Sequence, residues 1–288
     1  MQVNFSESLQ ISYVASHKQP VVHLFQLSSQ TECCIERGLP INGGGAKYED
    51  FGNTPMGIPN IADSLTAIDI AVYREKFISA SELLEALRGN FKDNEPLRQR
   101  LAQLPKFGQG DKAADEMAQR VSSTVCDIYD AYVKRIGGRV KPVIMTFTMA
   151  PVAGASLGAS ADGRLAGTPI AQGLTPQSSA MTDGLTTAIR SANTLPLHRF
   201  SGGASTMWDL DPVLATVENI KSILKVFIAT GGQIYQGNTT SVKELEAALK
   251  EPERYQHLVV RVGGFSGRFV SLTPEVQREI IGRYRHSS

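Results

Sequence analysis

The last third of the chain alternates short apolar segments with amphipathic ones, and this alternation limits the folds open to it. Apolar runs rich in Val, Ile and Tyr favour strands, and segments with apolar residues three or four apart favour helices. Strands are expected at 232–238, 257–262 and 265–270, and helices at 214–229, 241–249 and 273–284. Because strands separated by helices usually pair in parallel, the sequence predicts an α/β fold with largely parallel strands.

The first two thirds of the chain favour helices joined by glycine-rich loops. Residues 31–60 and 150–180 are rich in Gly, Pro and small polar residues, which predicts loops, and long loops in compact domains tend to be functional. Ser79 with Glu82, and Ser241 with Glu244, have the spacing of a helix capping box. Helices are expected at 63–76, 81–91, 97–104, 111–135 and 183–192, and a strand at 143–149.

Composition excludes several classes of protein. The 288 residues have a net charge of +1, so we expect binding to neither nucleic acid nor a membrane surface. Three cysteines make no disulfide framework, and the five histidines share no ligand spacing, so no metal site is expected. Residues 1–10 do not form a signal peptide and no apolar run has the length of a membrane span, so we expect a cytoplasmic protein.

The segment Arg261–Phe265 carries the most specific pattern in the chain. A strand leads into the glycine pair Gly263 and Gly264, which an aromatic residue follows. Taken alone, this pentapeptide fits a strand with a tight bend, because glycine inside strands often marks a bulge or turn. The surrounding sequence favours a second interpretation.

The tail 252–284 resembles the C-terminal glycyl radical domain of the pyruvate formate-lyase and diol-dehydratase superfamily. That family's pattern is Arg-Val-any-Gly-aromatic, then a short strand, then a helix with a glutamine and paired isoleucines. The matching residues are Arg261, Val262, Gly264, Phe265, Gln277, Ile280 and Ile281. By this spacing the resemblance places the radical on Gly264 rather than on Gly263.

The resemblance extends upstream through further segments in the same order as in the family. These segments are 43–52, 60–68, 82–91, 105–111, 159–176 and 231–238. The match covers nearly all of residues 20–286, and collinear segments are far more specific than one short motif. On this basis the chain resembles the C-terminal portion of a glycyl radical enzyme of the pyruvate formate-lyase and glycerol dehydratase type.

The resemblance implies the architecture of the chain. The family folds as a ten-stranded α/β barrel made of two five-stranded half-sheets, and this chain would supply the second half with the C-terminal glycine radical domain. Residues 1–160 would form the incomplete, C-terminal part of the barrel domain, and residues 161–288 the glycine radical domain. The chain would not close a barrel alone, so we expect exposed strand edges.

The resemblance also implies the chemistry at Gly264. A separate activating enzyme, which uses S-adenosylmethionine and an iron–sulfur cluster, would remove an α-hydrogen from Gly264, and the chain itself would bind no cofactor. Glycine suits this role because it has no side chain to force the radical carbon out of plane. Arg261, Val262 and Phe265 would support the loop. Because oxygen destroys such a radical, we expect Gly264 to be buried.

In the family the glycyl radical takes hydrogen from a cysteine in a Gly-Cys-Val-Glu loop, well upstream of the first matching segment. This chain has no such loop, so we expect it to be inactive alone. Cys33 and Cys34 are adjacent, as are two active-site cysteines of pyruvate formate-lyase, but here they lie a few residues before the glycine-rich segment 43–52, in an element that is not the family's thiyl site. A structural role for Cys33 and Cys34 is therefore favoured over a catalytic one, and Cys126 is expected in the core.

Three functional hypotheses follow from the resemblance. In the first, the chain is the C-terminal fragment or subunit of a glycyl radical lyase or formate acetyltransferase-like enzyme. Such an enzyme would break C–C, C–O or C–N bonds, or add fumarate, in a small organic substrate. Its partners would be the activating enzyme and a missing N-terminal half or partner subunit, and the full-length form would be a homo-oligomer. The second is a stand-alone radical carrier that docks on a damaged partner, and the third is a structural remnant.

Overall fold

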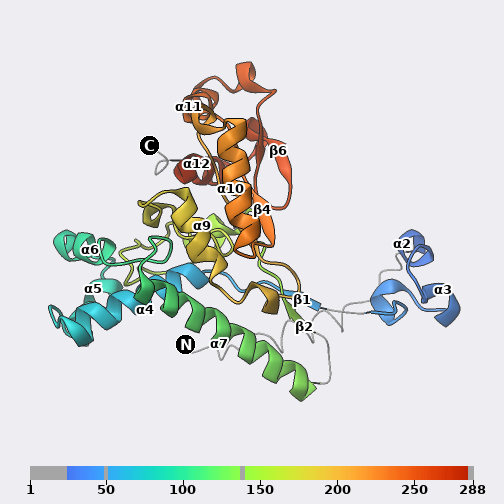
Figure 1. Ribbon diagram of the computed structural model, residues 1–288, viewed down its shortest axis with the longest axis horizontal. Helices are drawn as coiled ribbons and strands as arrows, with labels where there is room; N and C mark the ends of the chain where they lie inside the picture. Colours follow the sequence, from blue (N-terminus) through green and yellow to red (C-terminus); the bar gives the residue numbers. More distant parts are fainter. Residues whose placement is uncertain (1–24, 49–50, 137–139, 285–288) are drawn as a thin grey trace.

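A computed structural model describes residues 25–48, 51–136 and 140–284 (Figure 1). The helices are α2 Phe25–Ser29, α3 Cys34–Arg37, α4 Ile58–Ile68, α5 Ala80–Arg88, α6 Glu95–Ala102, α7 Lys112–Ile136, α8 Met149–Ala155, α9 Leu185–Asn193, α10 Val217–Ala229, α11 Val242–Lys250 and α12 Pro274–Tyr284. The strands are β1 Phe51–Asn53, β2 Val140–Pro142, β3 Ser205–Met207, β4 Ile234–Gln236, β5 Val259–Arg261 and β6 Ser266–Arg268. Short turns of other helix types are η1 Ile41–Gly43, η2 Asp69–Arg74, η3 Ser178–Ala180, η4 Leu197–Arg199, η5 Pro212–Leu214, η6 Pro252–Tyr255 and η7 Phe269–Ser271.

Four short strands lie side by side in parallel. β1 pairs with β2, and β3 pairs with β4. Just after β2, Ile144 bridges to Ala204 in parallel and its carbonyl accepts the Ser205 N–H at 3.0 Å, so the two pairs join in the order β1-β2-β3-β4. The prediction of an α/β fold with mainly parallel strands is therefore confirmed. The exception is the antiparallel pair formed by β5 and β6.

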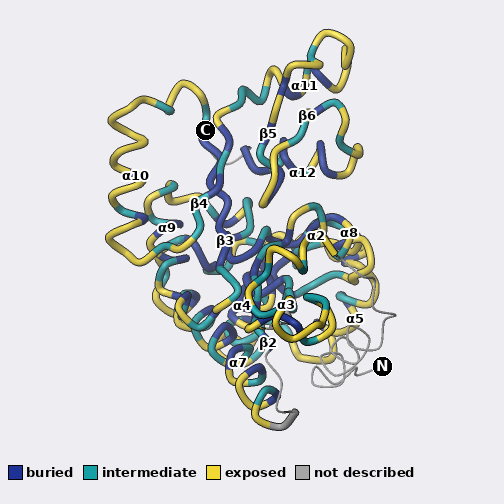
Figure 2. The backbone as a smooth tube through the Cα atoms, turned by 90° about the vertical axis from the view of Figure 1, so that its right-hand side faces the viewer, coloured by how far each residue is buried: buried dark blue, intermediate teal, exposed yellow. Residues whose placement is uncertain are grey.

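Two hydrophobic cores divide the body of the protein. The larger core joins residues far apart in the sequence, from Ile58 in α4 to Phe227 in α10, around the buried Trp208. A smaller core is built from buried residues of the 245–284 segment, in and around α11, β5, η7 and α12, with Val242 packed against it. Figure 2 shows that the buried residues gather around β3 and β4, whereas most of α10 is exposed. The larger core crosses residue 160, so the domain boundary expected there stays a prediction.

The predicted helices are present, with shifts at their ends. The helix expected from 63 begins instead at Ile58, because Pro59 in the first turn needs no hydrogen-bond partner for its nitrogen. The capping box of Ser79 and Glu82 is confirmed: Ser79 Oγ accepts the Glu82 N–H at 3.2 Å and Glu82 accepts the Ser79 N–H at 2.9 Å. The second capping box is wrong, since Ser241 caps α11 without a side-chain hydrogen bond.

The strand expected over 143–149 is wrong beyond its first residues. Ile144 pairs with Ala204, but Phe147 has φ +50° and turns the chain, and α8 begins at Met149. A residue in the left-handed region cannot continue a strand, whatever its β propensity. The loop expected over 150–180 consequently contains most of α8. β3 lies in a segment, Ser205–Met207, where no strand was expected.

Two findings, on membrane-spanning helices and on metal sites, concern the described part of the chain alone. Among residues 25–48, 51–136 and 140–284, no helix combines the length and apolar composition that would let it cross a membrane. In the same part, no three His, Cys, Asp or Glu side chains come together as a possible metal site.

Buried polar side chains fasten α4 to two loops. Asp63 Oδ1 accepts the Phe107 N–H at 2.8 Å, and Asn60 Oδ1 accepts the Ala171 N–H at 2.8 Å. Burial raises the pKa of the Asp63 carboxyl to about 7, although the nearby Lys106 cation opposes this rise. Burial also lowers the pKa of the Lys106 ammonium. Asp63 therefore gains a proton on folding over much of the neutral and mildly acidic range.

This shift gives a testable pH dependence of stability. Because folding raises the pKa of Asp63 from 3.8, its stabilising contribution is complete below pH 3.8 and is lost as the pH rises through about 7. Asp63→Asn, which keeps an acceptor for Phe107, should flatten the fall in unfolding free energy between about pH 4 and 7 by a few kcal/mol. Urea unfolding measures this. Asp183→Asn, at an exposed site, should leave the pH dependence of the unfolding free energy unchanged. If Asp63→Asn shows the same pH dependence as the wild type, the assignment is contradicted.

Candidate functional site

Gly263 and Gly264 form the tip of the β5–β6 hairpin. The Val262 N–H donates to the Phe265 carbonyl at 2.9 Å, which leaves only the two glycines between this pair. Gly264 has φ +82°, a conformation that glycine adopts without the steric penalty that other residues meet. The tip is therefore a turn built for glycine.

Phe147 covers one face of the Gly264 α-carbon. A Cβ added at Gly264 would lie 2.3 Å from Cε1 of the Phe147 ring. Real Cβ atoms essentially never come this close to another heavy atom. Phe147 itself is held at φ +50°, and its carbonyl accepts from Gln172 Nε2 at 3.3 Å. The backbone conformation thus favours glycine at 264, and the Phe147 ring would have to move to admit a larger residue.

Gln236, the last residue of β4, holds the other side of the loop. Its Oε1 accepts the Gly264 N–H and also accepts from Arg261 Nε at 2.9 Å. Its Nε2 donates to the Ser205 hydroxyl in β3. Gln236 is only 6% exposed, so these hydrogen bonds are shielded from competing water.

Two residues further on, Asn238 pairs with the backbone of β5 through its side-chain amide. Its Oδ1 accepts the Arg261 N–H at 2.5 Å, and its Nδ2 donates to the Arg261 carbonyl at 3.0 Å. Asp209 Oδ1 in turn accepts the Asn238 N–H at 2.8 Å. The amide side chain takes the place of a strand neighbour and attaches the hairpin to the parallel sheet.

A buried ion cluster supports this attachment from α12. Arg283 Nη2 donates to the Val262 carbonyl at 2.9 Å and to Glu279 at 2.5 Å, while Nη1 lies 3.7 Å from Asp209 Oδ2. Burial raises the pKa of the Asp209 carboxyl to about 6, with the Arg283 cation opposing the rise. The Asp209 side chain is only 1% exposed, so its charge depends on Arg283.

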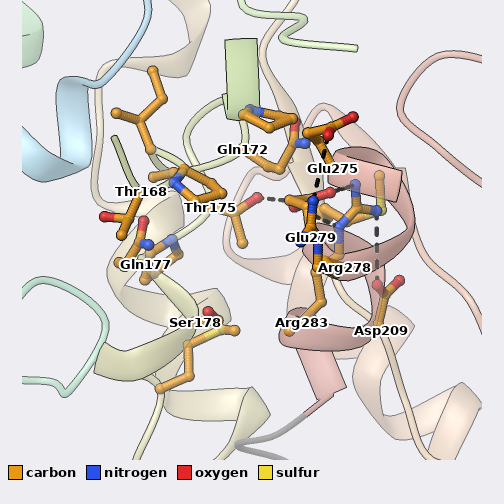
Figure 3. A pocket seen from close by; sticks show the side chains of 18 of the residues that line it. Thr168, Gln172, Thr175, Gln177, Ser178, Asp209, Glu275, Arg278, Glu279 and Arg283 are labelled. Atoms are coloured by element: carbon orange, nitrogen blue, oxygen red, sulfur yellow. Dashed lines mark hydrogen bonds and ion pairs between the residues drawn. The ribbon is translucent and has the colours of Figure 1, made fainter. Parts of the chain in front are cut away.

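Two cavities flank these residues. The larger, about 460 Å³, lies between α8, segment 167–178 and α12. Figure 3 shows Arg283 reaching Asp209 on one side of it, with Thr168 and Gln177 on the opposite side. Gly264 does not line this cavity. The smaller, about 10 Å³, lies directly beneath Gly263, has room for about one water, and is lined by Phe147 and Gln236 among others.

The structure brings some of the predicted site residues together and leaves others apart. Arg261, Val262, Gly264 and Phe265 share one hairpin, with Val262 fully buried. Gly264 is exposed, contrary to the expectation of burial, because Phe147 covers only one face of a projecting tip. Cys33 and Cys34 lie on the α2–α3 pair, which stands away from the hairpin (Figure 1). Cys126 is buried in the core, as expected.

Sequence reasoning assigned no role to several residues that hold the loop. Gln236 and Asn238 lie in a segment that matched the family, and their spacing of two places both on one face of an extended chain. That spacing was the available signal. No sequence signal pointed to Phe147, since its position follows from an unexpected turn.

The Arg283 cluster gives a prediction on stability. Arg283→Met leaves Asp209 and Glu279 buried without their cation, so the free energy of unfolding should fall by about 3–5 kcal/mol. Arg278, in the same helix, is exposed and donates to the exposed Glu275 and to the Pro274 carbonyl. Arg278→Met should therefore cost no more than about 1 kcal/mol. Chemical unfolding of both variants checks this, and similar losses would contradict the role given to the cluster.

Comparisons with known proteins agree with this geometry. Residues 9–154 match the family model for pyruvate formate lyase-like proteins, and residues 170–270 match the model for the glycine radical segment. Over 97% of its length the chain is 32% identical to the probable dehydratase YbiW of Escherichia coli (strain K12), of which it covers 36%. It is 31% identical to the trans-4-hydroxy-L-proline dehydratase of Clostridioides difficile, of which it covers 33%.

A solved structure shows the same fold. The glycerol-bound form of the B12-independent glycerol dehydratase from Clostridium butyricum aligns with a TM-score of 0.85 and 33% identity, covering 89% of this chain and 33% of that one. The chain thus spans about a third of the length of the proteins it matches. The predicted α/β fold, a C-terminal portion of the barrel found in these enzymes, is confirmed. The chain belongs to the family of pyruvate formate lyase-like glycyl radical enzymes.

Proposed function

We propose that this chain stores a protein-based radical on Gly264 for anaerobic radical catalysis. The observation that carries the proposal is the Gly264 environment: a glycine at φ +82°, covered by Phe147, with its N–H bound by the buried Gln236. A plain hairpin turn needs the φ value but neither a ring packed against the α-carbon nor a buried acceptor for the amide. The match of residues 170–270 to the glycine radical model supports the same role.

The chemistry requires a second protein. An activating enzyme would use an iron–sulfur cluster to generate an organic radical from S-adenosylmethionine, and this radical would take one hydrogen atom from the Gly264 α-carbon. The remaining unpaired electron is shared with the amide nitrogen on one side and the carbonyl on the other. The exposed tip of the hairpin is consistent with access by such a partner. In the cell this chemistry belongs to an anaerobic cytoplasm.

The reaction served by the radical is of the lyase type. Relatives of the chain include a trans-4-hydroxy-L-proline dehydratase and isethionate sulfite-lyases, and the glycerol dehydratase shares its fold. We propose that the chain acts with a further polypeptide portion that carries the thiyl cysteine and most substrate contacts, as a fragment or subunit of such a lyase. On this proposal the small organic substrate loses a group through C–O, C–N or C–C bond cleavage, or through the C–S cleavage that release of sulfite requires, and the chain alone is inactive.

A stand-alone radical carrier is the less supported alternative. Such a carrier needs only the radical segment, whereas this chain also matches the pyruvate formate lyase-like model over residues 9–154. Those residues form strands β1 and β2 of the parallel sheet, and helix α7 that lies beside them. This additional pair of parallel strands favours a piece of a catalytic barrel.

The radical assignment is tested by electron paramagnetic resonance. The chain is treated without oxygen with S-adenosylmethionine, a reductant and the activating enzyme of a related glycyl radical enzyme. The wild type should give a doublet, since one α-hydrogen remains on Gly264 and couples to the unpaired electron. Gly264→Ala should abolish the doublet, and a doublet that persists in this variant would overturn the assignment.

Gly267→Ala is the matched control in the same hairpin. A Cβ at Gly267 would meet its nearest neighbour, Leu272 Cδ2, at an ordinary 3.6 Å, so this variant should fold and keep the doublet. Circular dichroism confirms folding of each variant. The complete absence of a doublet in the wild type, with the activating enzyme active on its own partner, would refute the proposed function.

A further inference from the structure

Gln236 makes the contact between the parallel sheet and the amide of Gly264. Its Oε1 binds the Gly264 N–H and Arg261 Nε together, and its Nε2 is fixed by Ser205. Both ends of the side-chain amide are therefore occupied, which fixes the orientation of the acceptor oxygen. A glutamine held at both ends and buried at 6% exposure is a rigid support for one peptide plane of the loop.

A radical at Gly264 demands a change in backbone geometry. The α-carbon becomes planar when it loses a hydrogen, and it shares its electron with the flanking amides only as their planes approach its own. With φ +82°, the plane on the nitrogen side stands well away from this arrangement in the hydrogen-bearing chain. One side of the loop must therefore rotate relative to the other.

The two sides of Gly264 are held very differently. The nitrogen side is bound by Gln236 and backed by Arg261 and the buried Val262. The side leading to Phe265 is exposed, and the Phe265 side chain is 43% exposed. Rotation about the α-carbon is thus resisted more on the nitrogen side than on the exposed carbonyl side, where the Phe265 carbonyl accepts the Val262 N–H at 2.9 Å.

We propose that Gln236 is a positioning residue for the glycyl radical: its Oε1 fixes the nitrogen-side peptide plane of Gly264, so that the carbonyl side makes the adjustment when the radical forms. This inference rests on the proposed function of Gly264 and adds the residue that sets the orientation and persistence of its radical. Gln236 acts through the Gly264 amide and touches no substrate in this role.

Two substitutions distinguish the effect of the acceptor oxygen of Gln236 from the effect of its side-chain size. Gln236→Met keeps the length of the side chain but removes the acceptor oxygen. Gln236→Glu keeps an acceptor for Gly264 and Arg261, and the Ser205 hydroxyl can reverse its role and donate to the second carboxylate oxygen. Gln277→Met is the matched control, because Gln277 is 8% exposed and donates to the Phe269 carbonyl at 2.9 Å without contacting the loop.

Amide hydrogen exchange tests the contact without any activation. The Gly264 amide should exchange about tenfold faster in Gln236→Met than in the wild type, since a net hydrogen bond of this kind is lost. Gln236→Glu and Gln277→Met should keep the wild-type rate at Gly264. Equal exchange in Gln236→Met and the wild type would overturn the inference, as would equal acceleration in Gln236→Met and Gln277→Met.

Paramagnetic resonance tests the effect on the radical itself. After anaerobic activation, Gln236→Met should show an altered doublet splitting and a radical that decays several-fold faster than that of the wild type, while Gln236→Glu should restore both. Identical splitting and decay in Gln236→Met, beside a normal wild-type doublet, would refute the inference alone. A wild type without a doublet would refute the proposed function instead, and the amide exchange result would still decide whether Gln236 fixes the Gly264 plane.

Discussion

Side-chain amides join the β5–β6 hairpin to the parallel sheet. If β5 paired with β4 through its backbone, the two would form a longer and stiffer hydrogen-bonded sheet. Instead, the Asn238 side chain binds both the N–H and the carbonyl of Arg261. The backbone of β5 is then free to pair with β6, which it does in the opposite sense. The glycine tip is consequently carried by a hairpin that is attached to the sheet by side chains.

The attachment places polar groups where a core would usually be apolar. Asp209, Arg283 and Glu279 are nearly buried, and desolvation of such groups offsets much of their mutual attraction. What the cluster supplies is orientation: Arg283 donates to the Val262 carbonyl while Asp209 fixes Asn238. The smaller core, with Val262 at its edge, then provides the apolar burial that the polar cluster does not.

The sequence alone was informative where periodicity is strong or a family pattern is long. The long helix α7 and the alternation of the last third were expected, because local patterns determine them, and the long family pattern is what singled out Gly264. β3 was not predicted, because three residues in a glycine-rich segment carry little periodicity. Their strand conformation follows from the parallel neighbours on both sides. The support of Gly264 could not be predicted either, since Ser205, Gln236 and Phe147 meet there only after distant segments pack together.

The left-handed conformation of Phe147 costs stability, but it places the Phe147 ring against the Gly264 α-carbon. Glycine at 147 would relax the backbone at φ +50° and could stabilise the fold by a few tenths of a kcal/mol to about 1 kcal/mol. The same change would strip the ring from Gly264 and leave the α-carbon open on both faces. Engineering that optimises this chain for thermal stability alone would therefore remove the ring that covers the Gly264 α-carbon.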